Sequence, residues 1–517
     1  MSSSYDVVVI GGGHNGLVAA CYLAQAGQRV VVLEAEPHIG GAAISTQAFE
    51  GVGARLSQYA YLVSLLPQHI ISDLGLNIAT IRRKVSSYTP VPGAPRDGLL
   101  VPVDDTARLN AEFTRVTGSD ARAWESFYGG LAEVAGRLFP TLTQPMPSSA
   151  QARELMGAQW WQHLTQAPLS DVIESTFSDD LVRGVVLTDG LIGTFARSDD
   201  ASLLQNICFL YHVIGNGTGD WDVPLGGMGA VTSALAARAQ ELGATLVTNA
   251  RVTAVETDGL TATVTVNNEE RLHATFVAAN CAPDMLHDLM GTGRKVQREA
   301  MHEGAQLKVN MVLKRLPRLV DERVAPQDAF AGTFHINELY SQLDAAYDTA
   351  NRGAIPRPAP AEIYCHSLTD PSILSPELQA SGAATLTVFA MHWPHQMFVD
   401  DNEGMRTRAQ AAVLASLNSV LAEPIEDCLY LDAQGAPCVE AKTTVDLETG
   451  IGLPTGNIFH TSLEWPWSDE AADVGAWGVE TEFANVVICG SGAQRGGGVS
   501  GIPGHNAAQA ILSKAPR

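Results

Sequence analysis

The feature that most constrains the fold is a glycine-rich turn between an apolar strand and a helix near the N-terminus. Val7–Ile10 is a short β-branched run, typical of a parallel strand buried on both faces. It leads directly into the pattern G-x-G-x-x-G, formed by Gly11, Gly13 and Gly16, and then into apolar residues at helical spacing. A second strand, Val30–Leu33, follows. This order predicts a Rossmann-type βαβ unit and therefore an α/β fold.

The spacing of the three glycines has a mechanical reason. The first makes the tight turn, the second lets backbone approach a pyrophosphate, and the third permits close packing of helix on strand. Glu34 ends the second strand, where a carboxylate accepts hydrogen bonds from a ribose 2′-hydroxyl and repels a 2′-phosphate. We read His14 as lining the phosphates and not as a catalyst. The predicted dinucleotide contacts here are Gly11, Gly13, His14, Asn15, Gly16, Glu34 and Ala35.

NAD and FAD share this fingerprint, and two further glycine turns favour FAD. One follows Glu34 closely, and the other lies near the C-terminus, between the apolar stretch Val486–Ile488 and a helical stretch at 506–512. Each would bring backbone or a helix start close to a second part of a long dinucleotide. The additional predicted FAD contacts are Gly40, Gly41, Ala42, Gly490, Ser491, Gly497, Gly498 and Val499.

The length of 517 residues predicts two domains, each built from segments that alternate along the chain. A helical stretch ending at Leu242 and the strands Thr245–Val247 and Phe276–Ala279 indicate a return to the cofactor domain. We therefore assign residues 1–85, 221–299 and 441–517 to an FAD-binding domain, and residues 86–220 and 300–440 to a substrate-binding domain of mixed sheet and helices.

The first substrate-domain segment is helical in pattern and rich in aromatic residues. Most of them are expected in the core, with roughly one in three lining a ligand site. They are Trp124, Phe127, Tyr128, Trp160, Trp161, Phe195, Phe209 and Tyr211.

Composition and charge exclude several classes of function. The formal net charge is −24 and the longest basic run is 82–84, which argues against a nucleic-acid partner. The seven scattered cysteines include no Cys-x-x-Cys pair, which predicts a reducing, cytoplasmic compartment. No run reaches the roughly 18 apolar residues of a membrane span. Contact with a membrane surface through an exposed apolar rim stays open.

The motifs as a set resemble the phytoene desaturase-like branch of the FAD-dependent amine oxidase superfamily. Within that branch the chain resembles the pyridine nucleotide-disulfide oxidoreductase domain-containing protein 2 group and its bacterial relatives. The match spans nearly the whole chain through VVVIGGGHNGLVAACYLAQAG, IGGAA, PLGGMGAVTSAL, HSLTDPSIL, GLPTGNIFH and CGSGAQRGGGVSGIPGHNAA.

The resemblance implies a glutathione reductase-like FAD domain, a separate substrate domain and the flavin ring at their junction. Relatives desaturate, saturate or isomerise long polyenes. By motif, Gly11, Gly13 and Gly16 would hold the pyrophosphate and Glu34 the adenosine ribose. The backbone of Val252 would meet the adenine edge. Gly40 and Gly41, with residues 490–499, would close over the ribityl chain and flavin.

The chain departs from the family pattern after its C-terminal Gly-Ser-Gly. Relatives usually carry Thr-His-Pro there, whereas this chain has Ala493, Gln494 and Arg495. This change leaves the polyene substrate open. Arg495 is the one candidate catalytic residue, since a guanidinium near a flavin stabilises negative charge or binds a carboxylate; its alternative is a structural ion pair. His392 and His395 lack further ligands nearby, so no metal site is predicted.

Our leading hypothesis is an FAD enzyme that moves a hydride between an apolar substrate and flavin N5, desaturating or isomerising a carbon–carbon bond. The absence of a second complete G-x-G-x-x-G argues against a separate NADPH domain. The electron acceptor is therefore open among oxygen, a quinone and another protein, unless the reaction is redox-neutral. The alternatives are an FAD-dependent amine oxidase and a non-catalytic flavin-binding interaction protein.

Overall fold

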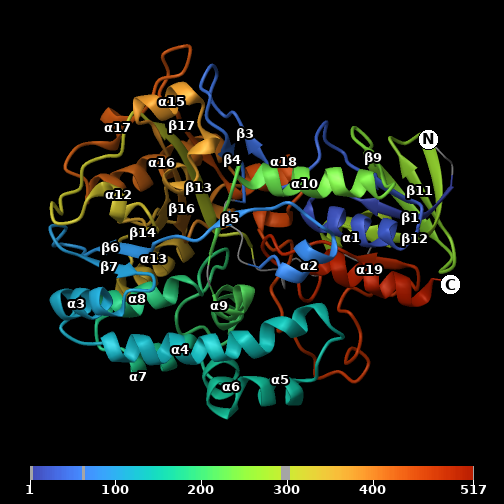
Figure 1. Ribbon diagram of the computed structural model, residues 1–517, viewed down its shortest axis with the longest axis horizontal. Helices are drawn as coiled ribbons and strands as arrows, with labels where there is room; N and C mark the ends of the chain where they lie inside the picture. The colour runs from blue at the N-terminus through green and yellow to red at the C-terminus, as the bar shows by residue number, and fades with distance from the viewer. Residues whose placement is uncertain (1–3, 61–64, 220, 293–302, 516–517) are drawn as a thin grey trace.

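The protein consists of two large sheets with helices packed around them, as Figure 1 shows for the computed structural model. The structure describes residues 4–60, 65–219, 221–292 and 303–515. Each sheet has seven strands within this part of the chain. Both chain ends lie beside the first sheet, and the second sheet lies at the opposite end of the molecule, above a layer of helices. The predicted α/β fold is confirmed.

The first sheet is built around the predicted βαβ unit. Its order is β10-β11-β12-β1-β2-β9, with β18 also paired to β12. The strands around β1 pair in parallel, whereas β10, β11 and β12 form an antiparallel meander. Parallel strands buried on both faces favour the continuous valine runs seen here. The strands are β1 Ser4–Ile10, β2 Val30–Leu33, β9 Thr245–Val247, β10 Val252–Thr257, β11 Ala262–Val266, β12 Glu270–Ala279 and β18 Val486–Ile488.

Three helices cover one face of this sheet. α1 (His14–Gln25) packs between α10 (Met228–Glu241) and α19 (Ile502–Lys514), so segments from the start, middle and end of the chain share one core. Val7 and Val9 of β1 point into this core, whereas Val8 and Ile10 point into the core beneath the meander. This alternation is the period of two expected of a strand.

The second sheet has the order β17-β13-β16-β15-β14-β6-β7. One face packs on α16 (Asn402–Asn418) through the apolar core that includes Leu307, Val309 and Met311 of β13. The intervening residues of β13 are polar although the whole strand is buried. The strands are β6 Val85–Pro90, β7 Gly98–Pro102, β13 Gln306–Leu313, β14 Thr333–Ile336, β15 Ala361–Tyr364, β16 Ala384–Met391 and β17 Val439–Lys442.

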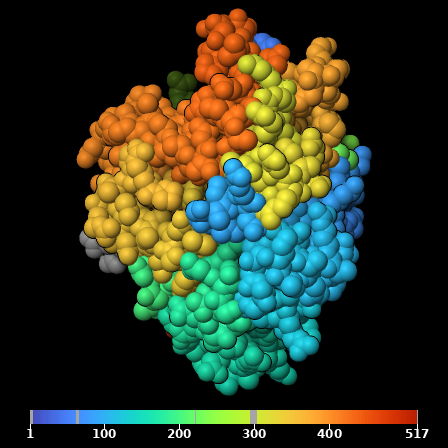
Figure 2. All heavy atoms as spheres, turned by 90° about the vertical axis from the view of Figure 1, so that its left-hand side faces the viewer, coloured from blue at the N-terminus to red at the C-terminus, as the bar shows by residue number. Residues whose placement is uncertain are grey.

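A layer of helices covers the other side of the second sheet. Figure 2 shows this layer, coloured cyan to green, below the yellow and orange segments of residues 300–440. α9 (Leu204–Val213) is buried along its whole length, which fits its apolar sequence. The other members are α3 Thr106–Val116, α4 Ala121–Leu138, α5 Ser149–Met156, α6 Ala158–Thr165, α7 Leu169–Thr176 and α8 Asp180–Thr188.

Shorter elements connect these layers. They are β3 Ser45–Thr46, β4 Leu56–Ser57, β5 Thr80–Ile81, β8 Val223–Pro224, α2 Gln68–Asp73, α11 Pro283–Leu289, α12 Pro326–Ala329, α13 Tyr340–Asn351, α14 His366–Thr369, α15 Pro376–Ser381, α17 Ile425–Cys428 and α18 Thr444–Ile451. Within the described residues, no helix has both the length and the apolar character needed to cross a bilayer.

Two of the domain boundaries predicted from the sequence cut through strands of the second sheet, and the boundary after residue 299 lies outside the described residues. The boundary after residue 85 lies inside β6, and the boundary after residue 440 lies inside β17, and both strands belong to the second sheet. The division into two discontinuous domains itself stays a prediction.

Candidate functional site

The glycine turn after β1 has the geometry that its sequence predicts. Gly11 has a φ of +95°, a conformation that side chains with a Cβ rarely adopt. A Cβ on Gly16 would lie 2.4 Å from the carbonyl oxygen of Gly11, so only glycine lets α1 start this close to the turn. Asn280, at the end of β12, donates from Nδ2 to the same oxygen at 3.2 Å. The turn is therefore held by α1 on one side and by Asn280 on the other. The start of α1, at Gly13 and His14, lines the main cavity.

Glu34 is tied to this turn. Its Oε2 accepts a hydrogen bond from the backbone N–H of Gly12 at 2.7 Å, and its Oε1 accepts one from Glu36 at 2.9 Å. The side chain is 8 % exposed and lines the main cavity of the protein. A fixed acceptor at this position suits a ribose hydroxyl.

The second predicted glycine turn packs directly on the first. The N–H of Gly40 donates to the carbonyl oxygen of Gly12 at 3.0 Å, and Gly13 and Gly40 form a parallel bridge. A Cβ on Gly41 would lie 3.1 Å from the Cα of Gly13. The two turns thus form one backbone surface, and it carries Ala35, Gly41 and Ala42 into the cavity lining.

The C-terminal glycine segment completes this end of the cavity. β18 delivers it beside β12, and Asn15 donates to the Ser491 hydroxyl at 3.4 Å. Gly504 of α19 lies so close to α1 that a Cβ would be 2.0 Å from the carbonyl oxygen of Asn15. Residues that are far apart in the sequence are therefore held at one site.

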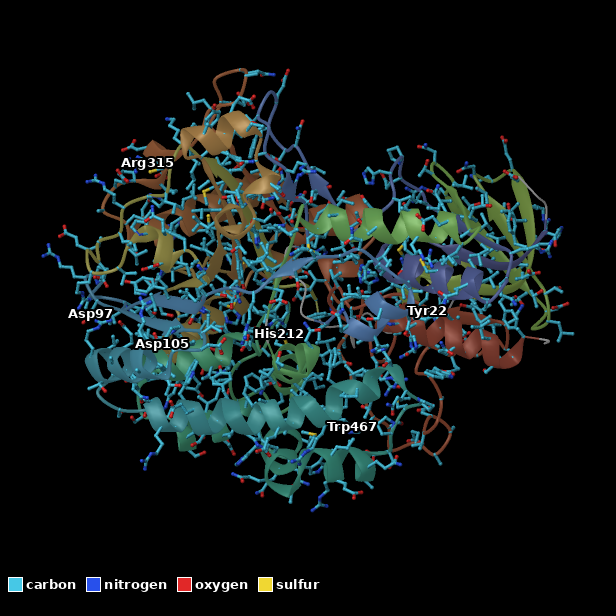
Figure 3. The ribbon with its side chains drawn as sticks, viewed as in Figure 1. Tyr22, Asp97, Asp105, His212, Arg315 and Trp467 are labelled. Atoms are coloured by element: carbon cyan, nitrogen blue, oxygen red, sulfur yellow. The ribbon has the colours of Figure 1, made fainter. Side chains whose placement is uncertain are left out.

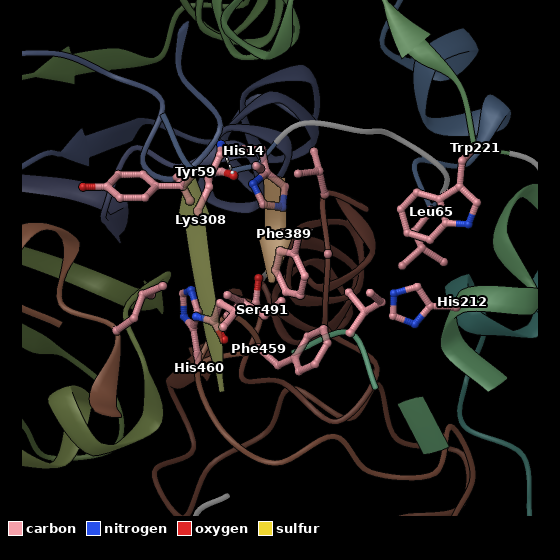
Figure 4. A pocket seen from close by; sticks show the side chains of 18 of the residues that line it. His14, Tyr59, Leu65, His212, Trp221, Lys308, Phe389, Phe459, His460 and Ser491 are labelled. Atoms are coloured by element: carbon pink, nitrogen blue, oxygen red, sulfur yellow. Dashed lines mark hydrogen bonds between the residues drawn. The ribbon is translucent and has the colours of Figure 1, made fainter. Parts of the chain in front are cut away.

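Most of the predicted cofactor residues line one cavity. Its volume is about 770 Å³, and it extends from the glycine turns to the second sheet and the helical layer (Figure 4). Of the predicted residues, Asn15, Gly16, Gly40, Gly490 and Gly497 support the turns without lining the cavity. Those that line it are Gly11, Gly13, His14, Glu34, Ala35, Gly41, Ala42, Val252, Ser491, Gly498 and Val499.

Several polar atoms at the glycine end lack a partner in the part of the chain that the structure describes. Nε2 of His14, Oδ1 of Asn15 and Nδ1 of His460 are buried without a hydrogen bond among the described residues. Buried polar atoms are normally paired, so these atoms favour a polar ligand at this end. Burial lowers the pKa of both histidines to about 4, so they are neutral donors or acceptors at neutral pH. These donors and acceptors fit the polar atoms of a flavin dinucleotide.

The far part of the cavity has an apolar wall made by the helical layer. Trp124, Tyr128 and Leu131 come from α4 and Val185 from α8, which accounts for two of the eight aromatic residues considered in the sequence. His212 on α9 lies near the centre of the molecule and also lines the cavity (Figure 3). Phe127 and Phe209 pack into the helical core instead.

The opposite wall is a row of side chains on the second sheet. Lys308 pairs with Phe389, Phe389 with Glu362, and Glu362 with His335, across β13, β16, β15 and β14. All four line the cavity. Since neighbouring strands lie about 4.8 Å apart, the row spans roughly 14 Å. Lys308 is the end of the row that lies nearer the glycine turns. Its Nζ donates to the carbonyl oxygens of Ser57 and Tyr59 at 2.6 and 2.8 Å.

Burial shifts the titration of the charged groups in this wall. It lowers the pKa of Lys308 to about 7 and raises that of Glu362 to about 7. The same effect raises the pKa of Asp189, another lining residue, to about 6. Such shifts cluster at functional sites, where ligands change the local charge.

This polar row was not predicted from the sequence, and neither was any metal-ligating residue. His335, Glu338 and Glu362 are nevertheless buried with ligand atoms within 4.8 Å of one another. A readable signal was the alternation of polar with apolar residues in QLKVNMVL, TFHI and AEIY, which are buried throughout. In a buried strand, such alternation indicates a polar surface facing a cavity.

Arg495, the one candidate catalytic residue, does not lie in the cavity lining. It is 2 % exposed, and its guanidinium donates to the carbonyl oxygens of Thr141, Gln144 and Trp477. These contacts tie the C-terminal segment to the helical layer. They favour a structural role for Arg495 over a catalytic one, through hydrogen bonds to carbonyl oxygens and not through the ion pair that we considered.

Comparisons with known proteins identify relatives of the chain. Residues 16–315 match the model of a family described as flavin containing amine oxidoreductase. An uncharacterized protein of Mycobacterium tuberculosis is 51 % identical over 529 residues, covering 98 % of this chain and 97 % of that protein. The Mus musculus pyridine nucleotide-disulfide oxidoreductase domain-containing protein 2 is 28 % identical over 99 % of this chain and 94 % of that protein.

Solved structures support the fold. A putrescine oxidase variant superimposes with a TM-score of 0.64 at 18 % identity, covering 99 % of each chain. At this identity the likeness concerns the arrangement of the chain alone.

Proposed function

This chain belongs to the flavin containing amine oxidoreductase family and is an FAD-dependent oxidoreductase, and from that premise we propose that it oxidises or isomerises a carbon–carbon bond of a largely apolar substrate. When bound, FAD supplies a two-electron acceptor for hydride. The observation that carries the proposal is the continuous cavity between the glycine turns and the apolar helical wall.

In this proposal the protein binds and orients both ligands. Gly11, Gly13 and the N-terminus of α1 hold the pyrophosphate, Glu34 the ribose, and Val252 the adenine edge. The segment 490–499 would hold the ribityl and ring portion. The walls from α4, α8 and α9 exclude water from an apolar substrate chain, because its burial there is favoured by the hydrophobic effect.

The test is anaerobic mixing of the FAD-loaded protein with limonene, squalene and phytoene while the flavin absorbance is followed. Bleaching by an alkene, with the dehydrogenated product found by mass spectrometry, is the expected result. The saturated analogue of each alkene serves as the control. An isomerised product without net bleaching also supports the proposal. Failure of every alkene, with dithionite still reducing the flavin, contradicts it.

The second candidate is an amine oxidase, and the carboxyl groups in the cavity favour it. Asp189 and Glu362 line the substrate part, where an ammonium group would pair with a carboxylate. Oxygen uptake and hydrogen peroxide formation with putrescine, cyclohexylamine and benzylamine distinguish this activity from the first. A bound flavin that no alkene or amine reduces would favour the non-catalytic interaction protein.

A further inference from the structure

A compact cluster of ligating side chains lies in the substrate part of the cavity, away from the glycine turns. His335 comes from β14, Glu338 from the loop that follows it, and Glu362 from the neighbouring strand β15. Their ligand atoms lie within 4.8 Å of one another and all three residues are buried. His335 and Glu362 face the cavity, and Glu338 lies behind them.

The carboxylate of Glu338 is incompletely satisfied. It is 0 % exposed; one oxygen is hydrogen-bonded to Nδ1 of His335, and the other, Oε1, has no hydrogen-bond partner among the described residues. His335 is also its one ion-pair partner in that part of the chain. A carboxyl oxygen buried without a partner is costly, and a metal ion in place of the carboxyl proton would supply the partner that the described residues do not.

An arginine of the cavity lining does not fill that role. Arg83 lines the same cavity, but its guanidinium donates to the Trp221 carbonyl at 3.2 Å and to the Thr333 hydroxyl at 2.9 Å. Its positive charge is thus fixed beside the cluster by other acceptors.

The donor set suits a divalent transition metal. One imidazole and two carboxylates are ligands that Zn²⁺, Mn²⁺ and Fe²⁺ accept, at metal–ligand distances of about 2.0–2.2 Å. Opposite ligands of one ion are then about 4.2 Å apart, so donors within 4.8 Å need only small side-chain movements. The Tyr364 hydroxyl donates to Glu362 and would hold that carboxylate in place from outside the cluster.

We propose that His335, Glu338 and Glu362 bind a divalent transition-metal ion, and that its open coordination position takes an oxygen atom of the substrate. The role in substrate binding rests on the proposed function, whereas metal binding itself does not. The ion would lie at the far end of the row from Lys308, separated by roughly two to three strand spacings, or 10–14 Å. The substrate would then be apolar along most of its length, with a hydroxyl, carbonyl or carboxylate group at the end remote from the glycine turns.

The test is metal analysis of the full-length, FAD-loaded protein after incubation with Zn²⁺, Mn²⁺ or Fe²⁺ and dialysis. We expect metal stoichiometric with the chain, and at least tenfold weaker binding in Glu338→Gln with the FAD content retained. Glu440→Gln, on β17 of the same sheet but outside the cluster, is the matched control and should keep both metal and FAD. No bound metal in the wild type, or equal binding in Glu338→Gln, overturns the proposal.

A measurement on the wild-type protein tests the proposal even if the Glu338→Gln protein fails to fold. Titration with Mn²⁺, followed by electron paramagnetic resonance, should show a bound signal that Zn²⁺ displaces and that an added long-chain alcohol alters. An alkane of the same length should leave the bound signal unchanged. Flavin bleaching by an alkene without bound metal would overturn the metal site alone. Bound metal without alkene turnover would overturn the proposed function alone.

Discussion

The contact between Gly16 and Gly11 gives a quantitative prediction for Gly16→Ala. In an unobstructed helix, alanine in place of glycine is stabilising by about 1 kcal/mol. Here the new Cβ would lie 2.4 Å from the Gly11 carbonyl oxygen and 3.0 Å from Nδ2 of Asn280. Overpacking of this kind costs about 1–3 kcal/mol, so we expect net destabilisation of about 0–2 kcal/mol.

A matched control separates helix propensity from the steric contact. Gly129 lies within α4, and a Cβ there would meet nothing within 4 Å, so Gly129→Ala should be stabilising by about 1 kcal/mol. The two variants should differ by about 1–3 kcal/mol in the free energy of unfolding in urea.

The same substitution should weaken FAD binding, because α1 must move away from the turn that faces the pyrophosphate. A cost of about 1.4 kcal/mol in the bound state corresponds to a tenfold increase in the dissociation constant. Quenching of FAD fluorescence on titration into the apoprotein measures this. A Gly16→Ala protein that binds FAD as tightly as Gly129→Ala and unfolds at the same urea concentration would refute the reasoning.

Three further substitutions test other parts of the site. Glu34→Gln removes the charge from the Gly12 hydrogen bond, worth about 1.5–3 kcal/mol, and should weaken FAD binding at least tenfold, unlike the neighbouring Glu36→Gln. Because Lys308 has a pKa of about 7, the spectrum of bound FAD should change with a midpoint near pH 7, and Lys308→Met should abolish this change. The lowered pKa also predicts that stability rises between pH 7 and about 10, where the unfolded lysine holds the extra proton. Arg495→Met should lower the free energy of unfolding by about 3 kcal/mol or more, because it removes hydrogen bonds to buried carbonyl oxygens. The folded chains should still bind FAD. Unchanged stability with slower reduction of the flavin would instead support the catalytic hypothesis.

The cofactor half of the molecule was largely predictable because its signals are local. Val30–Leu33 and Thr245–Val247 are strands with the predicted bounds, and the apolar stretch Val486–Ile488 also forms a strand. Val30–Leu33 is fully buried and Val486–Ile488 nearly so, which fits their apolar sequences, whereas Thr245–Val247 is partly exposed at the edge of the sheet. The glycine turns were equally readable, since their backbone conformations exclude most other residues.

The substrate half was less predictable because its geometry depends on pairing between distant strands. β14 and β15 have four residues each, and β14 also pairs with β6, which lies over two hundred positions earlier in the chain. No local pattern says that Lys308, Glu362 and His335 share one row. Arg495 differs in the other direction. Its position after a glycine motif predicted a catalytic role, whereas in the fold its guanidinium donates to backbone carbonyl oxygens.

The polar row on the second sheet is best understood as a cost that ligand binding offsets. Lys308, His335 and Glu362 are each 5 % exposed or less, and the opposite face of the same strands is wholly apolar. Apolar residues at these positions would stabilise the sheet, because buried charged groups lose hydration that their partners only partly replace. Three such groups in one register, facing a cavity beside the predicted cofactor site, therefore lower the stability of the sheet. Binding of a ligand to them would offset this loss. The row is therefore where selection among apolar substrates by their polar ends should take place, and it is the first place to substitute once a substrate is found.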